Sequence, residues 1–278
     1  MILKAYAKIN LTLDIVGKRN DGYHLIDSVF QSVGIFDTVT VNKSDKISVL
    51  CGDIGGENNI AFTAAKEFFC LTGISGGADI KIEKGIPLLS GLGGGSADAA
   101  AVIIALNIIY GTSLSKEKLL NIALKCGADV PFFLFGGTAR VGGIGEKVEP
   151  ISDIDGYYAV LLKSGEKEST RDMYAHIDNE TSLSAVTGEF TTLLNKGEYS
   201  CAIKKVSNAF LGVQKNREAY NALKSQNPIG VSLSGSGPTY FAVFGNKSDA
   251  YSAVKDLNSQ GFLSVAVPFV SRSVAVVE

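Results

Sequence analysis

The chain has 278 residues, of which 46% are hydrophobic and 19% are charged. That composition supports a substantial core and argues against a disordered chain, and a typical domain of ~150 residues predicts one large or two ordinary domains. The 26 basic and 28 acidic residues leave a net charge of −2 with no basic block, so nucleic acid is not an expected partner. The longest apolar run, residues 99–110, is shorter than the ~18 residues that a membrane span requires, so no membrane association is expected.

The four cysteines and two histidines are scattered along the chain. No C-x-x-C pair occurs, so neither a zinc site nor a disulfide framework is expected. The first residues contain no long apolar segment of the kind that directs secretion. Scattered thiols without such a segment predict a cytoplasmic protein.

The first half of the sequence mixes strand and helix patterns. Residues 3–16 place alternate apolar side chains on one face, as a strand does. Residues 59–71 and 116–126 show the apolar spacing of helices, and each is followed by a glycine that is typical of a helix end. The remaining predicted elements of this half are strands at 39–49, interrupted at 42–45, and at 78–84, and a helix at 96–110.

The second half predicts a similar mixture. Its expected elements are a strand at 157–163, helices with loops over 164–200, strands at 231–233 and 239–244, a helix at 248–259 and strand-like residues 262–277. Strands and helices alternate without a strict β-α-β order, which indicates an α+β protein with two lobes. We place the boundary after Pro150, with one domain over 1–155 and a second over 156–278.

The sharpest local motif is a glycine-rich loop that opens a helix. Residues 87–97 read PLLSGLGGGSA, and an alanine-rich helical segment follows at once. Glycine lets the backbone approach a ligand closely, and the N-terminus of a helix favours an anion, most often phosphate. The segment could also be a glycine-rich turn with Ser96 as an ordinary helix cap, but this density of glycines favours phosphate binding. The Ser96 hydroxyl could then cap the helix or reach a magnesium–phosphate complex.

Two commoner phosphate motifs are absent from this loop. A P-loop requires a lysine directly after its glycines, and none follows here. The dinucleotide fingerprint requires Gly or Ala where Ser96 stands, and an acidic residue about 20 positions further on, which is missing.

The loop instead resembles the second motif of the GHMP small-molecule kinases, P-x-x-x-G-L-G-G-G-S. The match continues in chain order over nearly the whole sequence. The other matching segments are residues 7–13 (AKINLTL), 17–24 (GKRNDGYH), 127–133 (GADVPFF), 136–146 and 231–239 (VSLSGSGPT). The first three of these resemble the branch of the family that acts on 4-diphosphocytidyl-2-C-methyl-D-erythritol.

The resemblance implies an α+β, two-lobed GHMP kinase fold. An N-terminal ATP-binding lobe and a C-terminal ferredoxin-like α/β lobe would enclose the active site in the cleft between them. The implied activity is ATP-dependent phosphorylation of the 2-hydroxyl of the cytidyl substrate, in the non-mevalonate route to isoprenoid precursors. ATP would be the cosubstrate with Mg²⁺, the partner would be a small cytidine-diphosphate compound, and the protein would be a monomer or homodimer.

The resemblance also assigns catalytic roles. Asp129 would be the base that accepts the proton of the substrate hydroxyl, although a lone aspartate in a turn is more often only a solvated residue. Lys8 would lie beside it, hold the carboxylate ionised and offset charge at the phosphoryl group, although a lone lysine could also point to solvent.

Binding roles follow from the same resemblance. The ring of Tyr23 would stack on the cytosine, His24 would hydrogen-bond the edge of the base, and Tyr174 would close the other side. Asn10 would orient the sugar alcohol or its phosphates. The implied ATP-binding residues are Pro87, Leu88, Leu89, Ser90, Gly91, Leu92, Gly93, Gly94, Gly95, Ser96 and Ala97, with Ser96 a candidate ligand of nucleotide-bound magnesium. The implied substrate-binding residues are Asn10, Tyr23, His24, Thr170, Tyr174, Gly235, Ser236 and Gly237.

The sequence departs from the family pattern at Ala97, where a second serine is usual, at Asn208–Phe210, where an acidic pattern is usual, and at Lys163–Gly165, where a proline-containing stretch is usual. Two alternatives stay open at this point. One is a GHMP kinase for a smaller alcohol such as mevalonate or homoserine, which would have no use for a base-stacking Tyr23. The other is a non-catalytic nucleotide-binding protein on the same fold, against which the presence of both Lys8 and Asp129 argues.

Overall fold

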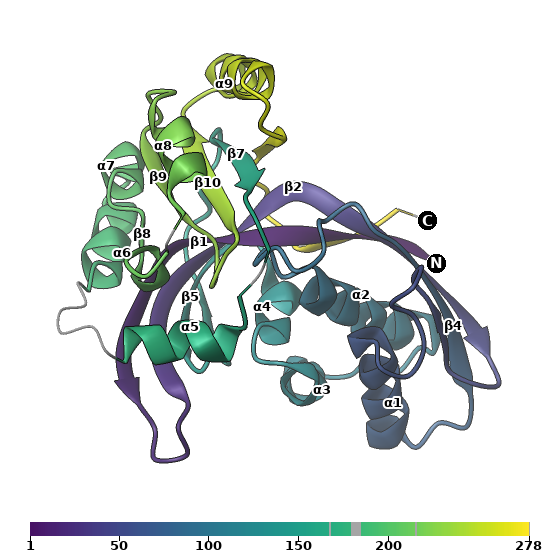
Figure 1. Ribbon diagram of the computed structural model, residues 1–278. Helices are drawn as coiled ribbons and strands as arrows, with labels where there is room; N and C mark the ends of the chain where they lie inside the picture. The colour runs from purple at the N-terminus through teal and green to yellow at the C-terminus, as the bar shows by residue number, and fades with distance from the viewer. Residues whose placement is uncertain (167, 179–184, 215, 278) are drawn as a thin grey trace.

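The computed structural model describes residues 1–278 except 167, 179–184, 215 and 278. Its described residues form two β-sheets, and Figure 1 shows the second sheet standing over one side of the first, with helices α1 to α4 on the opposite side. The strands of the first sheet are β1 (Ile2–Lys18), β2 (His24–Ser44), β3 (Ser48–Leu50), β4 (Gly77–Glu83), β5 (Thr138–Gly143), β6 (Lys147–Pro150), β8 (Ser207–Asn208) and β12 (Val274–Val276).

The first sheet is built around the long hairpin of β1 and β2. The two strands pair from Ile2 opposite Thr40 to Lys18 opposite His24, so the hairpin turn projects well beyond the other strands. The sheet order is β12-β1-β2-β4-β3. Strand β5 pairs with residues 26–31 of β2, and β6 pairs with β5. Because side chains alternate between the two faces of a strand, β1 can bury apolar residues and still present Lys8 and Asn10 on one face.

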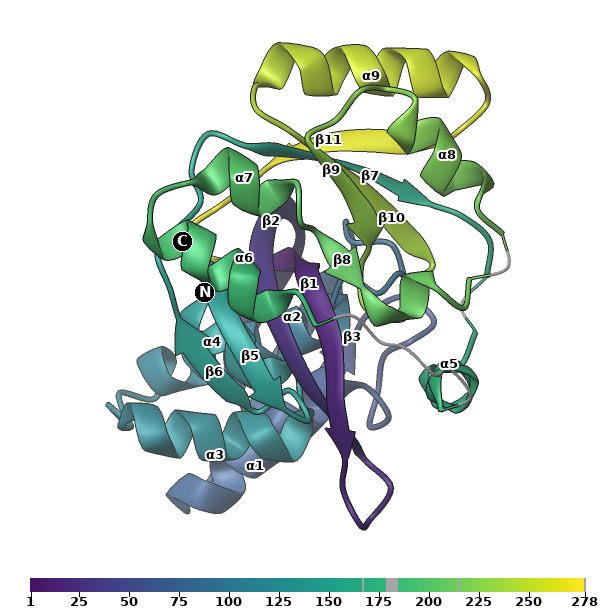
Figure 2. The same ribbon diagram turned by 90° about the vertical axis from the view of Figure 1, so that its left-hand side faces the viewer.

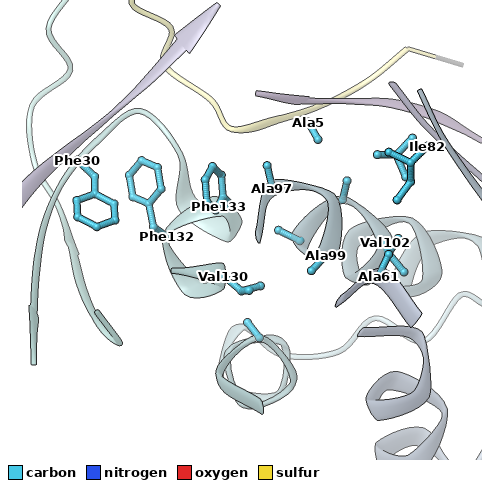
Figure 3. Close-up of a cluster of buried hydrophobic side chains, with 14 of the residues drawn as sticks. Ala5, Phe30, Ala61, Ile82, Ala97, Ala99, Val102, Val130, Phe132 and Phe133 are labelled. Carbon is cyan, nitrogen blue, oxygen red and sulfur yellow. The ribbon is translucent and has the colours of Figure 1, made fainter. Parts of the chain in front are cut away.

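Helices α1 to α4 cover one face of this sheet. In α1, Ala61, Ala64, Ala65 and Phe68 form the buried face. Figure 3 shows the aromatic end of this core, where Phe30, Phe132 and Phe133 lie in a row near Val130 and Ala97. The helices of this layer are α1 (Ile60–Thr72), α2 (Gly94–Ile109), α3 (Lys116–Cys126) and α4 (Val130–Phe135).

The second sheet has four strands in the order β11-β7-β10-β9, and all of its neighbours are antiparallel. Figure 2 shows α8 and α9 above it. This order, with one helix before β9 and one before β11, is a ferredoxin-like arrangement and confirms the predicted α+β class. The elements are β7 (Tyr158–Lys163), β9 (Gly230–Leu233), β10 (Thr239–Phe244), β11 (Ser264–Pro268), α8 (Glu218–Lys224) and α9 (Lys247–Ser259).

A helical insertion lies between β7 and α8. It consists of α5 (Thr170–Ile177), α6 (Thr187–Asn195), α7 (Tyr199–Ile203) and the short 3₁₀ turn η1 (Ala209–Leu211). Helices were predicted over 164–200, and 167 and 179–184 of that stretch lie outside the described residues. The insertion matters for function because it carries α5 to the tip of the β1–β2 hairpin.

Several expected elements differ from the observed ones. The strand expected to break at 42 runs on to Ser44 and begins at His24, because β2 pairs in turn with β1, β4 and β5. The strand-like stretch 262–277 is two strands in different sheets, β11 and β12. The proposed division at residue 155 falls between β6 and β7, although β8 and β12 return to the first sheet, so that division stays a prediction.

Candidate active site

A cleft of about 1020 Å³ opens between the two sheets, and both sides contribute to its lining. The first side supplies β1, the hairpin end and the glycine loop, and the second supplies α5 and the loop that joins β9 to β10. The cleft therefore lies where the resemblance placed the active site. The predicted site residues that line it are Lys8, Asn10, Tyr23, His24, Pro87, Leu88, Leu89, Ser90, Gly91, Gly93, Gly94, Gly95, Ser96, Asp129, Thr170, Tyr174, Gly235 and Ser236.

Three of the predicted residues are not part of this lining. Leu92 and Ala97 are buried in the core, 1% and 0% exposed, so their side chains face the protein. The third is Gly237, which follows the lining residues Gly235 and Ser236 in the same loop. Since position 97 packs in the core, the missing second serine removes no side chain from the described lining of the cleft.

Lys8 and Asp129 form an ion pair at the floor of the cleft. The Lys8 Nζ lies 3.6 Å from Asp129 Oδ2 and 4.4 Å from the centre of the Phe30 ring. The lysine side chain is only 4% exposed, whereas the aspartate, directly before α4, is 36% exposed. The ammonium of a buried lysine thus lies beside a carboxylate that a ligand in the cleft can reach.

Asn10 connects this pair to the second lobe. Its side-chain oxygen accepts from Lys8 Nζ at 2.7 Å and from the backbone N–H of Gly235 at 2.7 Å. Its amide nitrogen donates to Ser28 Oγ at 3.2 Å, which fixes the amide orientation. The Gly235 loop is held in turn by Asn208, whose Nδ2 donates to the carbonyls of Leu233 and Gly235 at 2.7 and 2.9 Å. Asn208, where the sequence departed from the family pattern, thus supports the loop.

The glycine loop needs its glycines for space. Gly91 has φ +79°, and a Cβ there would lie 2.4 Å from the carbonyl oxygen of Ser234 in the opposite loop. Gly93 has φ +75°, and its Cβ would lie 2.6 Å from Phe133 Cζ. The Ser234 hydroxyl donates to the Gly91 carbonyl at 3.0 Å, so the loops of the two lobes are in direct contact.

Helix α2 starts earlier than predicted. Its cap is Gly93 and its first residue is Gly94, so Ser96 is not the cap and its hydroxyl is left to the cleft. The helix N-terminus faces the loop, as an anion site requires. No described residues form a cluster of three or more His, Cys, Asp or Glu side chains able to hold a metal.

A buried charge cluster lies behind the glycine loop and was not foreseen from the sequence. Lys84 donates to Asp37 and, at 2.8 Å, to Asp98 Oδ2 in the first turns of α2. Asp37 also accepts the backbone N–H groups of Gly85 and Ile86 at 2.7 and 2.8 Å. Burial raises the pKa of Asp98 to about 8, and the charge of Asp37 adds to this against the opposing effect of Lys84. No sequence signal marks the cluster, because its members lie on three separate elements.

Part of the cleft lining is aromatic. Tyr23 follows the hairpin turn and is 61% exposed. The ring of His24 stacks on Tyr174 of α5, with centroids 4.3 Å apart and planes 9° apart, and Tyr174 meets Phe210 edge-on at 4.9 Å. Burial raises the pKa of Tyr174 to about 12, with a smaller contribution from Asp129. Tyr174 therefore stacks on His24 here, and Tyr23 keeps an open face.

Two polar contacts tie α5 to the rest of the cleft. Asp178, at the end of α5, lies 2.7 Å from His24 Nε2 and accepts from Lys18 Nζ at 2.6 Å. Thr170 Oγ1, at its start, lies 3.2 Å from Ser236 Oγ. The hydrogen bond of Lys18, followed by that of His24, lowers the pKa of Asp178. Asp178 was not among the predicted residues, because its position in the sequence gives no hint that it meets the hairpin.

Comparisons with known proteins agree with this geometry. The family model for the N-terminal domain of GHMP kinases matches residues 59–137, and the model for their C-terminal domain matches 205–262. None of the described helices is long and apolar enough to cross a membrane.

Curated relatives match over most of the chain. A protein of Carboxydothermus hydrogenoformans is 39% identical over 97% of this chain and 97% of its own length. One of Clostridium acetobutylicum is 37% identical over 90% of this chain and 93% of its own. Both carry the name 4-diphosphocytidyl-2-C-methyl-D-erythritol kinase.

Solved structures show the same fold. A crystal structure of 4-(cytidine 5′-diphospho)-2C-methyl-D-erythritol kinase superposes with a TM-score of 0.80 at 29% identity, covering 97% of this chain and 99% of the other. A homoserine kinase from Cytophaga hutchinsonii reaches 0.75 at 21% identity over 100% of this chain and 97% of its own, which shows a shared fold only. With two lobes of this architecture and relatives of one name along nearly its full length, the chain belongs to the GHMP kinases, in the family of the 4-diphosphocytidyl-2-C-methyl-D-erythritol kinases.

Proposed function

We propose that the protein transfers the γ-phosphoryl group of ATP to the 2-hydroxyl of 4-diphosphocytidyl-2-C-methyl-D-erythritol, a step towards isoprenoid precursors. The observation that carries the proposal is that one cleft is lined by both the Lys8–Asp129 pair and the aromatic residues Tyr23 and His24. A substrate with a nucleobase at one end and a reacting alcohol at the other fits such a cleft. The names of the relatives support the same reaction.

In this reaction, Asp129 would lie next to the substrate hydroxyl. As the hydroxyl oxygen forms its bond to the γ-phosphorus, the bond from that phosphorus to the β-phosphate oxygen breaks and ADP leaves. The proton of the hydroxyl passes to Asp129. Lys8, 3.6 Å from the carboxylate, keeps it ionised beforehand and offsets negative charge at the transferred group. Asn10 holds the Lys8 ammonium in place through its 2.7 Å hydrogen bond.

ATP would lie against the glycine loop. Its phosphates would meet the N-terminus of α2, and its adenine would meet the apolar surface of Leu88 and Leu89, which are 47% and 73% exposed. The glycine loop and the loop between β9 and β10 come into close contact at Gly91, beside the site proposed for the phosphates.

Magnesium would arrive with the nucleotide. Mg²⁺ at kinase sites keeps several waters and is held by one or two protein oxygens together with substrate phosphates. The Ser96 hydroxyl lines the cleft as such an oxygen. Bound there, the ion would neutralise charge on the β- and γ-phosphates.

The cytosine would lie against Tyr23 and His24. The exposed ring of Tyr23 would stack on it, and His24 would hydrogen-bond its edge, with Tyr174 supporting His24 from behind. Thr170, Ser236 and Gly235 also line the cleft, and the diphosphate and sugar would run past them.

An ADP-release assay tests the proposal. The protein with Mg·ATP should turn over the cytidyl substrate but neither mevalonate nor homoserine, and Asp129→Asn should abolish turnover while its circular dichroism stays that of wild type. Turnover with a smaller alcohol instead would keep the fold and refute the assignment of Tyr23 and His24. ATP binding without any turnover would favour a non-catalytic role.

The cellular location and the oligomeric state of the protein are further proposals. We propose that it acts in the cytoplasm, which the four free cysteines support. We further propose that the protein is a monomer or a homodimer.

A further inference from the structure

The contact between His24 and Asp178 fixes which ring nitrogen of the histidine carries a proton. His24 Nε2 lies 2.7 Å from Asp178 Oδ1. Hydrogen bonds from Lys18 and His24 hold the pKa of Asp178 below its usual range, so this carboxylate is ionised and can only accept. The hydrogen of the pair must therefore lie on Nε2.

The opposite nitrogen is then an acceptor. In a neutral imidazole with its hydrogen on Nε2, the lone pair lies on Nδ1. Among the described residues, Nδ1 of His24 has no hydrogen-bond partner, while the residue lines the cleft. Stacking on Tyr174 at 4.3 Å fixes the plane of the ring, and the contact of Nε2 with Asp178 fixes which edge faces the cleft. With a neutral imidazole, a ligand in the cleft thus meets a fixed acceptor rather than a donor.

Such an acceptor distinguishes two otherwise similar nucleobases. Cytosine carries an amino group at C4, which donates, whereas uracil carries a carbonyl oxygen there, which only accepts. We propose that Asp178 is a positioning residue that fixes His24 as an acceptor for this amino group and thereby selects cytosine over uracil. The inference rests on the proposed function, because it assumes that the base lies against His24.

Lys18 makes the contact asymmetric. It donates to Oδ2 of Asp178 at 2.6 Å, so each carboxylate oxygen has its own partner. In Asp178→Asn the lysine would retain the side-chain oxygen, and the amide nitrogen would face His24. That nitrogen donates, so the lone pair would move to Nε2 and the hydrogen to Nδ1. This variant should turn the acceptor into a donor.

Binding of two simple nucleotides tests the proposal without relying on turnover. The dissociation constants of cytidine 5′-diphosphate and uridine 5′-diphosphate are measured by calorimetry for wild type, Asp178→Ala, Asp178→Asn and Lys18→Ala. Wild type should prefer the cytidine compound by about tenfold to a hundredfold, as one correctly paired base contact gives. Asp178→Ala should lose most of this preference, and Asp178→Asn should shift it towards uridine.

Lys18→Ala is the matched control, because it removes the other partner of Asp178 but leaves the bond to His24. It should weaken both nucleotides alike and keep their ratio. A purely structural role of Asp178 would also weaken both alike, so an unchanged ratio in Asp178→Ala overturns the proposal. A wild type that binds both nucleotides equally overturns it as well, whereas absent turnover with preserved cytidine preference would count only against the proposed reaction.

The tautomer can also be observed directly. The chain has only two histidines, His24 and His176, so the imidazole ¹⁵N signals can be assigned with His176→Gln. In wild type, His24 should show a hydrogen on Nε2 and a bare Nδ1, and in Asp178→Asn the reverse. Cytidine 5′-diphosphate should move the Nδ1 signal of wild type. A wild-type His24 with its hydrogen on Nδ1 contradicts the proposal.

Discussion

The backbone N–H of Gly235 donates to the side-chain oxygen of Asn10 at 2.7 Å, and the same oxygen accepts from Lys8. One amide oxygen therefore joins the second lobe to Lys8. The position of Lys8 depends on the loop between β9 and β10 as well as on its own strand.

Asn10→Ala should lower kcat by about tenfold to a hundredfold, because it leaves the buried Gly235 N–H and the Lys8 ammonium without this acceptor. Steady-state kinetics measure the effect. Ser28→Ala is the control, since Ser28 accepts from the Asn10 nitrogen and donates to the Thr12 carbonyl, while the bond between Asn10 and the second lobe stays. Equal losses in both variants would show that the amide orientation, rather than the link between lobes, matters.

Lys8→Met tests the charge of the lysine while keeping most of its buried stem. We expect kcat to fall by about 10²–10³, as for other groups that stabilise a transition state electrostatically, with a much smaller change in KM for ATP. Rapid-quench measurement of the chemical step checks this. A wild-type rate of that step would remove Lys8 from the mechanism.

Gly91→Ala should disrupt the contact between the two loops. Its Cβ would lie 2.4 Å from the Ser234 carbonyl, at a φ of +79°. Gly111→Ala is the matched control, because Gly111 has a similar φ of +63° but nothing within 4 Å. Urea unfolding should show a loss of about 1 kcal/mol for the control, from backbone strain alone, and a larger one for Gly91→Ala together with lost activity. Similar losses for the two variants would mean that the loops separate easily.

Asp98 should make stability fall as pH rises. Its pKa is about 8 in the folded protein against 3.8 as the ordinary value, so between these values the folded state binds more protons than the unfolded state. The free energy of unfolding then decreases with rising pH over that window. Asp98→Asn should flatten this dependence, measured by urea unfolding at a series of pH values, and the exposed Asp45→Asn should leave it unchanged. An unchanged dependence in Asp98→Asn would show that Asp98 binds no additional proton in the folded state.

Tyr23→Ala should raise the KM of the cytidyl substrate by about tenfold to a hundredfold, because stacking of a base on an aromatic ring contributes roughly 1–3 kcal/mol. Tyr23→Phe keeps the ring and should behave like wild type. The KM for ATP serves as an internal reference and should not move in either variant. If Tyr23→Phe were as impaired as Tyr23→Ala, the hydroxyl would be the important group.

Periodicity located the elements whose burial is simple. Helix 116–126 was predicted at its observed bounds, and strands were predicted at the positions of β7, β9, β10 and β11 of the second sheet. The start of β2 and the pair β5 and β6 were missed. Their residues are bounded by glycines and polar side chains. They form strands because β5 pairs with the start of β2, and β6 pairs with β5.

The motifs located the cleft but not what supports it. The glycine loop, Lys8 and Asp129 could be found because each belongs to a short recognisable segment. Lys84, Asp98 and Asp178 could not, since a buried or bridging charge is defined by the element opposite to it. Tyr174 was found, but its stacking on His24 rather than across from Tyr23 depends on how α5 docks.

The pairing of β12 with β1 can form only late in the synthesis of the chain. Residues 3–5 of β1 pair with 274–276, so the strand that carries Lys8 leaves the ribosome long before its neighbour exists. During that interval its backbone edge is open, and open edges are where chains pair with one another. The nascent first lobe should therefore depend on chaperones until residues 274–276 emerge, and chains that stop before them should accumulate as aggregates.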